Sequence, residues 1–124
     1  MTLEERLEIL TNSSVIDCDI KESLLKIINV FKNKYNIVLT EENGSILITH
    51  LAMALVRIKN NQDIKDINKI DNLVYEEVIE SEYFQTANNI YKDLEYISRV
   101  AIPENEKKYI LVNICVILDN YKTI

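Results

Sequence analysis

The amino-acid sequence predicts an all-α fold, a bundle of five or six helices. Apolar residues recur at intervals of three and four along most of the 124 residues, which is the spacing of one face of a helix. One glycine and one proline serve the whole chain, whereas sheet-rich folds need many turn residues. Residues 36–39 could form a short strand, but the sequence offers no second strand to pair with it. Long helices joined by short polar connections account for all three observations.

The predicted helices follow one another from the N-terminus, each with its own start signal. Side chains that can accept a hydrogen bond from a first-turn N–H mark four starts: Thr2 with Glu5 as a capping box, Asp17 or Asp19, Thr40, and Ser81. The fourth helix is predicted from apolar residues that begin at Ile67, and the sixth has Pro103 in its first turn, where the missing N–H costs nothing. The six apolar faces end near Thr11, Tyr35, Lys59, Val78, Ile97 and Tyr121.

Length and composition indicate one domain over residues 1–124. The chain has room for a single core, and no linker or internal repeat divides it. The two cysteines, Cys18 and Cys115, each lie among aliphatic residues and form no CxxC pair, so both are expected to be buried, reduced thiols. We therefore expect a domain that folds without disulfides, metals or cofactors.

Charge and hydropathy exclude several function classes. Fourteen Lys and Arg against 20 Asp and Glu give a net charge of −6, which repels nucleic acid, and no basic stripe compensates locally. The N-terminus is charged from its fourth residue, unlike a signal peptide, and no apolar run approaches the ~18 residues that span a membrane. We expect a cytoplasmic protein that binds neither nucleic acid nor membrane directly.

The single histidine is the first polar residue that the pattern places on an apolar face. His50 shares one face of the third helix with Ile46 or Leu47, Leu51 and residues further along. Arg57 follows seven residues later, two turns along nearly the same face. From the residues alone, a histidine that packs and hydrogen-bonds in the core is the favoured interpretation, because no nucleophile or carboxylate partner accompanies it.

Asn113 is the second such residue, on the apolar face of the last helix. A buried amide there must find hydrogen-bond partners. The favoured interpretation is a bond to another helix, or a half-exposed position at the edge of that face, rather than a chemical role.

Enzymatic and metal-dependent functions are disfavoured. Adjacent glutamates on a helix point in different directions and make no preset acid–base pair, and one glycine cannot build a phosphate-binding loop. The sequence has no second histidine, and neither cysteine lies at metal-ligand spacing from His50. The chain is predicted not to be an enzyme and to hold no metal.

Two stretches resemble a known family. Residues 39–58, LTEENGSILITHLAMALVRI, resemble the signature of the PTS regulation domain (PRD): a helix with His-Leu, an Arg seven residues after the His, and a polar turn. Residues 102–114, IPENEKKYILVNI, are similar to the family's second motif, an acidic helix start that leads to Tyr-Ile-x-x-His. His50 and Arg57 match the first motif, and Asn113 stands where the second has its histidine.

The resemblance implies both a fold and a function. It implies a helical bundle, often a homodimer, whose histidines are phosphorylated by the histidine phosphocarrier protein or by a sugar-permease B component of the bacterial phosphotransferase system (PTS). It implies transcriptional control of sugar uptake or catabolism, with His50 as phosphoacceptor and Arg57 as its electrostatic neighbour.

The sequence also departs from the family pattern. Asn113 cannot be phosphorylated, Thr49 stands where an Asp often precedes the first His, and one copy is present without a nucleic-acid-binding domain. We therefore expect any effect on transcription to pass through a partner. The alternative is a degenerate interaction or dimerisation module in which His50 is not phosphorylated.

Overall fold

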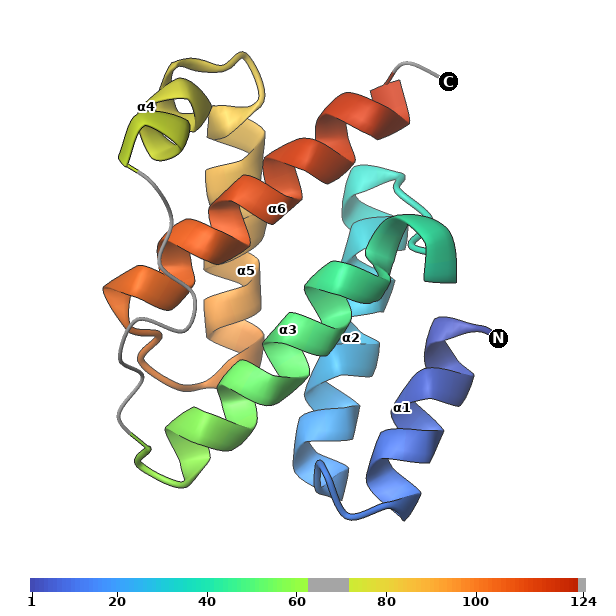
Figure 1. Cartoon of the computed structure of the whole chain (residues 1–124). Coiled ribbons are helices and arrows are strands. Elements are labelled where there is room, and N and C mark those ends of the chain that lie inside the picture. The colour runs from blue at the N-terminus through green and yellow to red at the C-terminus, as the bar shows by residue number, and fades with distance from the viewer. Residues whose placement is uncertain (63–71, 123–124) are drawn as a thin grey trace. The chain divides into compact units, whose positions relative to one another are not determined.

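The computed structural model describes residues 1–62 and 72–122 as helices and the connections between them (Figure 1). Within these residues there are six α-helices and no strand, which confirms the all-α prediction. The chain divides into two compact units, Met1–Gln62 and Asp63–Ile124, and each is described by itself. The expectation of one domain over residues 1–124 stays a prediction.

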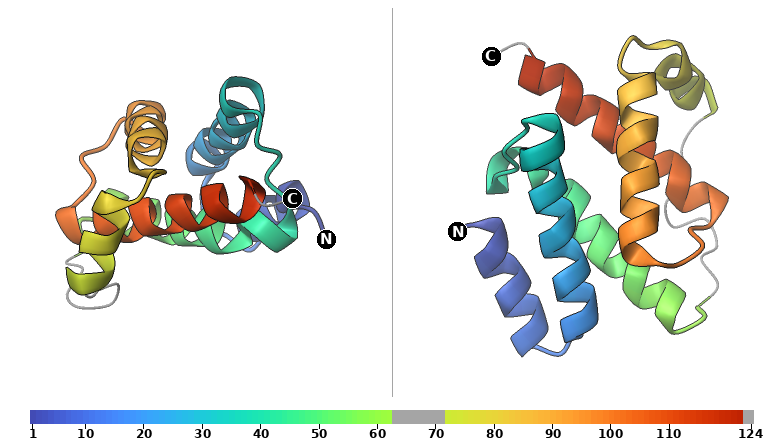
Figure 2. Two further views of the ribbon diagram at one scale, coloured as in Figure 1. Left: turned by 90° about the horizontal axis from the view of Figure 1, so that it is seen from above. Right: turned by 180° about the vertical axis from the view of Figure 1, so that it is seen from behind.

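Three helices form the first unit, and each pair of them is in contact. They are α1 (Leu3–Asn12), α2 (Cys18–Tyr35) and α3 (Glu41–Lys59). Helix α2 returns antiparallel beside α1, and α3 crosses them obliquely (Figures 1 and 2). Large apolar side chains at helical spacing are buried on all three helices, among them Leu3, Leu7, Leu24, Ile27, Phe31, Leu47, Ile48 and Leu51. Burial of these faces is the main term that holds three short helices together.

The starts of these helices lie where the sequence predicts them. The side chains of Thr2, Asp17 and Thr40 each accept a hydrogen bond from a first-turn N–H. Asp17 rather than Asp19 is therefore the cap of α2, with its Oδ1 2.8 Å from the nitrogen of Ile20. Each bond satisfies an N–H that helical geometry leaves without a partner, which is why a local sequence signal is sufficient to predict it.

Residues 36–39 connect α2 to α3 and form no strand. Asn36 ends α2 in the left-handed conformation, at φ 59°, and its N–H bonds the carbonyl of Phe31. Asparagine tolerates this conformation better than most residues. Ile37 and Leu39 are buried while Val38 is exposed, so the connector packs two of its apolar side chains without pairing.

The second unit contains α4 (Asn72–Glu80), α5 (Phe84–Ser98) and α6 (Glu104–Lys122). Helix α5 packs against α6, and α4 contacts both. Buried side chains of α5 and α6 form its interior, among them Ala87, Ile90, Leu94, Ile110, Leu111 and Ile114. Helix α4, by contrast, has no buried residue.

Two predicted helix starts in this unit are displaced. Ser81 is not the cap of α5. A cap at Ser81 would start the helix at residue 82, whereas α5 begins at Phe84. Ser81 and Phe84 are joined by a turn hydrogen bond, and Tyr83 precedes the helix with no side-chain cap bond. Helix α6 begins one residue after Pro103, whose carbonyl accepts the N–H of Lys107 at 2.9 Å. The predicted fourth helix began at Ile67, which lies outside the described residues.

The two cysteines differ in environment. Cys115 is buried in α6, as predicted, and burial raises the pKa of its thiol. Cys18 is exposed, so the expectation that both are core residues was wrong for it. Cys18 is the first residue of α2, directly after the cap, where the apolar face that starts at Ile20 has not yet begun. Among the described residues, no helix combines the length and apolarity needed to cross a bilayer.

Candidate functional site

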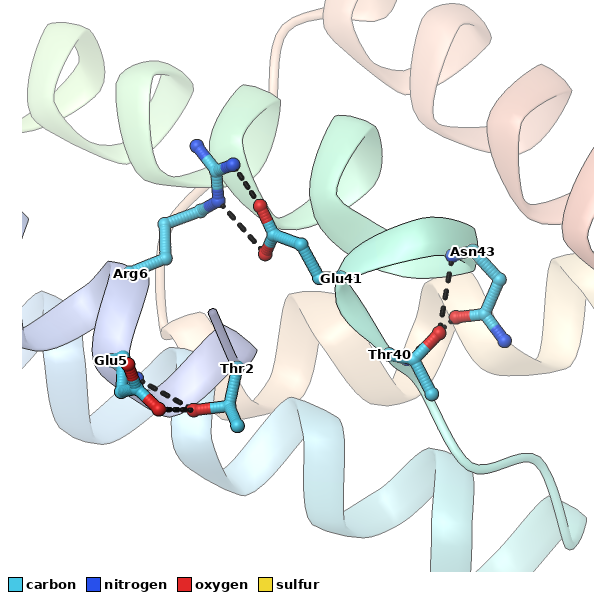
Figure 3. Close-up of polar contacts among 6 residues, drawn as sticks. All are labelled: Thr2, Glu5, Arg6, Thr40, Glu41 and Asn43. Atoms are coloured by element: carbon cyan, nitrogen blue, oxygen red, sulfur yellow. Dashed lines mark hydrogen bonds and ion pairs between the residues drawn. The ribbon is translucent and has the colours of Figure 1, made fainter.

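Helix α3 carries the predicted site, and its first turn is held from both sides. Thr40 and Asn43 form a reciprocal capping box: the nitrogen of Thr40 lies 2.7 Å from Oδ1 of Asn43, and the nitrogen of Asn43 lies 3.3 Å from Oγ1 of Thr40 (Figure 3). Asn43 Nδ2 also donates to the carbonyl of Val38 at 3.1 Å. This turn therefore ties α3 to the connector that precedes it.

An ion pair joins the same turn to α1. The guanidinium of Arg6 meets the carboxylate of Glu41 through two nitrogens, with Nε 3.1 Å from Oε2 (Figure 3). The bidentate arrangement fixes direction as well as distance. The hydrogen bond from Arg6 lowers the pKa of the Glu41 carboxyl, so the pair stays charged at neutral pH.

Gly44 lies on the side of α3 that packs against the preceding connector and α1. A Cβ atom at this position would lie 3.1 Å from Cβ of Leu39 and 3.3 Å from Cδ1 of Leu3, closer than ordinary van der Waals contact. The glycine is buried, and it lets the helix approach the connector and α1 more closely than a larger residue would. These contacts support a close approach at Gly44 rather than an incidental glycine.

His50 is half-buried on α3 and lies away from the Gly44 side of the helix. Leu47 is almost fully buried, whereas Ile46 is 67% exposed, which decides between the two neighbours that the sequence offered. Counting about 100° per residue, His50 lies about 40° around the helix from Ile46 and about 120° from Gly44. The imidazole therefore belongs to the border between the packed side of α3 and its exposed side.

Arg57 is half-buried on the same border. Seven residues correspond to about 10 Å along the axis and only about 20° around it. Helical side chains generally lean toward the N-terminus, a tendency that favours a path of the long Arg57 side chain toward the turn that contains His50. A guanidinium at this position is suited to meet an anion placed on the imidazole.

Asn113 lies on α6, in the second unit, and is half-buried. Its Nδ2 donates to the carbonyl of Tyr109 at 2.9 Å, four residues earlier on the same helix. The amide is thus satisfied within its own helix at a half-exposed edge, one of the two positions that the sequence predicted for it.

The burial of two polar groups was not predicted from the sequence. Glu106 is the buried charged residue of the described chain, with no exposed surface, in the first turn of α6. Its spacing of four from Ile110 on the apolar face was the signal that could have indicated its burial. The hydroxyl of Thr49 is also buried and makes no hydrogen bond among the described residues. An ionised Asp at that position would carry a far larger desolvation cost than a threonine does.

A cavity of about 430 Å³ lies in the first unit, away from the predicted site residues. It is lined by the turn between α1 and α2 and by the end of α3, including Ile16, Cys18, Val56 and Lys59. His50 and Arg57 are not among its lining residues. No group of three or more His, Cys, Asp or Glu side chains in residues 1–62 and 72–122 is placed to hold a metal ion.

Comparison with known proteins adds two findings to this geometry. A family model described as "PRD domain" matches residues 25–114, which is most of the chain and includes His50, Arg57 and Asn113. The chain is also 27% identical over 112 residues to the uncharacterized protein YhfY of Escherichia coli K12, covering 90% of this chain and 91% of that protein. No solved structure matches the chain.

Proposed function

Because this chain belongs to the PRD domain family, a family of PTS regulatory modules, we propose that it is a phosphorylation-responsive regulator whose phosphoacceptor is His50. The proposed donor is the histidine phosphocarrier protein or a sugar-permease B component, and the proposed output is transcriptional control of sugar uptake or catabolism. We further propose that the module acts in the cytoplasm, as a homodimer, and through a protein partner rather than through nucleic acid.

One observation carries the proposal. His50 is half-buried at the edge of α3, on nearly the same face as Arg57, rather than sealed in the interior. A fully buried imidazole could not meet a donor protein, and a fully exposed one would gain little from the nearby guanidinium. The border position satisfies both requirements at once.

With the histidine phosphocarrier protein as donor, the proposed chemistry is a transfer between two imidazoles. The N–P bond of the donor's phosphohistidine breaks and a new N–P bond forms to a ring nitrogen of His50. The donor ring keeps the electron pair of the broken bond and takes up a proton at its other nitrogen. The His50 ring releases one proton from its own other nitrogen, so protons and charge balance.

Phosphorylation gives α3 a new charge that its surroundings must accommodate. A phosphoryl group adds roughly two negative charges and several strong acceptor oxygens. At a half-buried position this charge is costly unless a cation meets it, and Arg57 is the candidate from the same helix face. The proposed response is a change in helix packing or in the dimer interface, biased by this local electrostatic change.

The experiment is phosphoryl transfer followed by intact-mass spectrometry. With phosphoenolpyruvate, enzyme I and the phosphocarrier, the chain is expected to gain the mass of one phosphate. His50→Ala should gain none. Because the sequence contains one histidine, the mass alone assigns the site. A folded wild-type chain that takes up no phosphate from any PTS donor contradicts the proposal.

The role of Arg57 is tested at equilibrium with the same donor. Arg57→Gln is expected to lower the equilibrium constant for phosphorylation of His50 by about tenfold. This corresponds to the low end of the free energy that a charge-assisted hydrogen bond contributes. Arg57→Lys keeps the charge and should recover part of it. An unchanged equilibrium in Arg57→Gln would remove Arg57 from the site while leaving His50 in it.

The second candidate is an interaction module in which His50 only packs, and Asn113 favours it. At the second phosphoacceptor position, the side-chain amide of Asn113 donates a hydrogen bond to the carbonyl of Tyr109. This residue therefore has a packing role that requires no phosphate. This candidate predicts that His50→Gln keeps self-association and regulation unchanged, and that no phosphate is incorporated.

A further inference from the structure

An exposed isoleucine lies one turn before the proposed phosphoacceptor. Ile46 is 67% exposed, and within the described residues it is the large apolar side chain of α3 that lies open to solvent. A single exposed apolar residue is ordinary on a protein surface. The position of Ile46, rather than its exposure, is what gives it a role.

The packing on the opposite side of α3 holds Ile46 outward. Gly44 is two residues earlier and so about 160° away around the helix. Because Gly44 lies against Leu39 and Leu3, rotating Ile46 inward would separate that contact. The capping box and the Arg6–Glu41 pair fix the same turn (Figure 3). The exposed side chain is therefore presented by a rigid segment, which lowers the entropic cost of binding through it.

The path of a phosphodonor to His50 passes over Ile46. The two residues are about 6 Å apart along the axis and about 40° apart around it. Helical side chains generally lean toward the N-terminus, a tendency that favours a position of the imidazole over the turn that carries Ile46. A reacting phosphorus atom must come within about 3–3.5 Å of the accepting nitrogen. A protein that delivers it therefore covers Ile46 as well.

We propose that Ile46 is the apolar anchor with which α3 docks its protein phosphodonor; this inference rests on the proposed phosphorylation of His50. The partner is a protein whose phosphohistidine is bordered by apolar side chains that receive Ile46. Contact between these apolar groups supplies binding next to the reacting atoms, and Arg57 meets the phosphoryl group from the other side of His50. Ile46 is a docking residue and takes no part in the bond changes.

The test compares a protein donor with a small one. Ile46→Ala keeps helix propensity, and far-UV circular dichroism confirms that the variant is folded. With the phosphorylated histidine phosphocarrier protein, the second-order rate of phosphorylation should fall by about tenfold or more, as expected for the loss of most of a buried isoleucine. With phosphoramidate, which is too small to contact Ile46 and His50 together, the rate should stay within about twofold of wild type.

Two further variants define the specificity of the effect. Ile46→Met keeps an apolar side chain of similar size and should recover most of the rate with the protein donor. Ile9→Ala removes an isoleucine that is 53% exposed on α1, and it should change neither rate. Together they separate an anchor at this position from a general loss of apolar surface.

The outcomes distinguish this inference from the function on which it rests. Equal losses with both donors, or no loss with the protein donor, overturn the docking role and leave His50 as phosphoacceptor. Phosphorylation by phosphoramidate but not by the carrier protein overturns it too, because the named donor then does not dock. Loss of self-association in Ile46→Ala would assign the surface to a second copy of the chain. Failure of both donors on the wild-type chain removes the proposed function itself.

Discussion

The two units of this chain are helical to a similar extent, but their helices are fixed in different ways. In the first unit each helix begins at a side-chain cap, and ion pairs join Arg6 to Glu41, Glu8 to Lys21 and Asp17 to Lys59. These contacts connect α1 with α3, α1 with α2, and the start of α2 with the end of α3. In the first unit, local side chains therefore cap the helix starts, and ion pairs join one helix to the next.

In the second unit, α5 has a buried face but no side-chain cap at its start. Helix α5 begins after Tyr83 with no side-chain cap bond and ends at Arg99 in the left-handed conformation. Tyr91 is buried, donates to Glu95 at 3.3 Å, and has Lys107 Nζ 5.4 Å from the centre of its ring. Helix α4 contributes no buried side chain at all. The position of α5 therefore rests on its packing, which a local sequence signal describes poorly.

The largest effect that tests this comparison is expected from filling the space at Gly44. Gly44→Val would place its side chain against Leu39 and Leu3, where the added Cβ alone is already closer than ordinary contact. Overpacking of this kind typically costs about 1–3 kcal/mol. Urea unfolding should show a lower midpoint, and hydrogen exchange should locate the loss in residues 1–62. Wild-type stability in Gly44→Val would mean that α3 is free to shift.

A smaller effect is expected at the cap of α2. Asp17→Ala removes both the hydrogen bond from Ile20 and the pairing with Lys59, and loss of a cap costs about 1 kcal/mol. Asp17→Asn keeps a good cap and loses only the ion pair, which is exposed, so its cost should be a few tenths of a kcal/mol. Urea unfolding at neutral pH separates the two. If both variants cost the same, the cap is not the stabilising contact.

The pH dependence of the same pair has a definite sign. The hydrogen bond from Lys59 lowers the pKa of Asp17 in the folded state. Stability from a lowered carboxyl pKa is present above the unfolded value, near 3.9, and is lost as the pH falls through the folded value. The difference in stability between wild type and Asp17→Asn should therefore be constant near neutral pH, begin to shrink near pH 4, and vanish only as the pH falls through the lowered pKa of folded Asp17.

The smallest effect is expected at the end of α5, and it is a gain. Arg99 adopts a φ of 58°, which costs a residue with a side chain roughly 1 kcal/mol relative to glycine. Arg99→Gly should stabilise the chain by about 0.5 kcal/mol once the greater freedom of the unfolded chain is subtracted. Asn36→Gly, at the matching end of α2, should gain less, because asparagine tolerates this conformation. Thermal unfolding measures both gains. Equal gains would mean that Asn36 and Arg99 are equally strained at the ends of α2 and α5.

The sequence was sufficient for the fold class and for the helix starts of the first unit. Thr2, Asp17 and Thr40 act on N–H groups two or three residues away, so their signals are local and can be read directly. Ser81 carries the same signal but lies in a turn that ends α4, and the packing of α4 and α5 decides where α5 begins. Cys18 was misplaced because its aliphatic neighbours Val15 and Ile16 precede α2, so their character does not indicate which side of the helix Cys18 lies on.

The candidate site was predictable in part. The spacing of His50 and Arg57 on one helix is fixed by helical geometry, and so it follows from the sequence. Which side of α3 faces solvent does not follow, because it depends on the contact of Gly44 with Leu39 and Leu3 from elsewhere in the chain. That is why Ile46 and Leu47 could not be told apart until the packing was known.

The asparagine at position 113 has a consequence for the proposed regulation, because it leaves His50 as the one histidine of the sequence. A module with two phosphoacceptor histidines can occupy four modification states and weigh one signal against another. This chain has one histidine, and its Asn113 is already bonded to the carbonyl of Tyr109. Under the proposed phosphorylation of His50 it would have two such states, and its response would not depend on a second phosphorylated histidine.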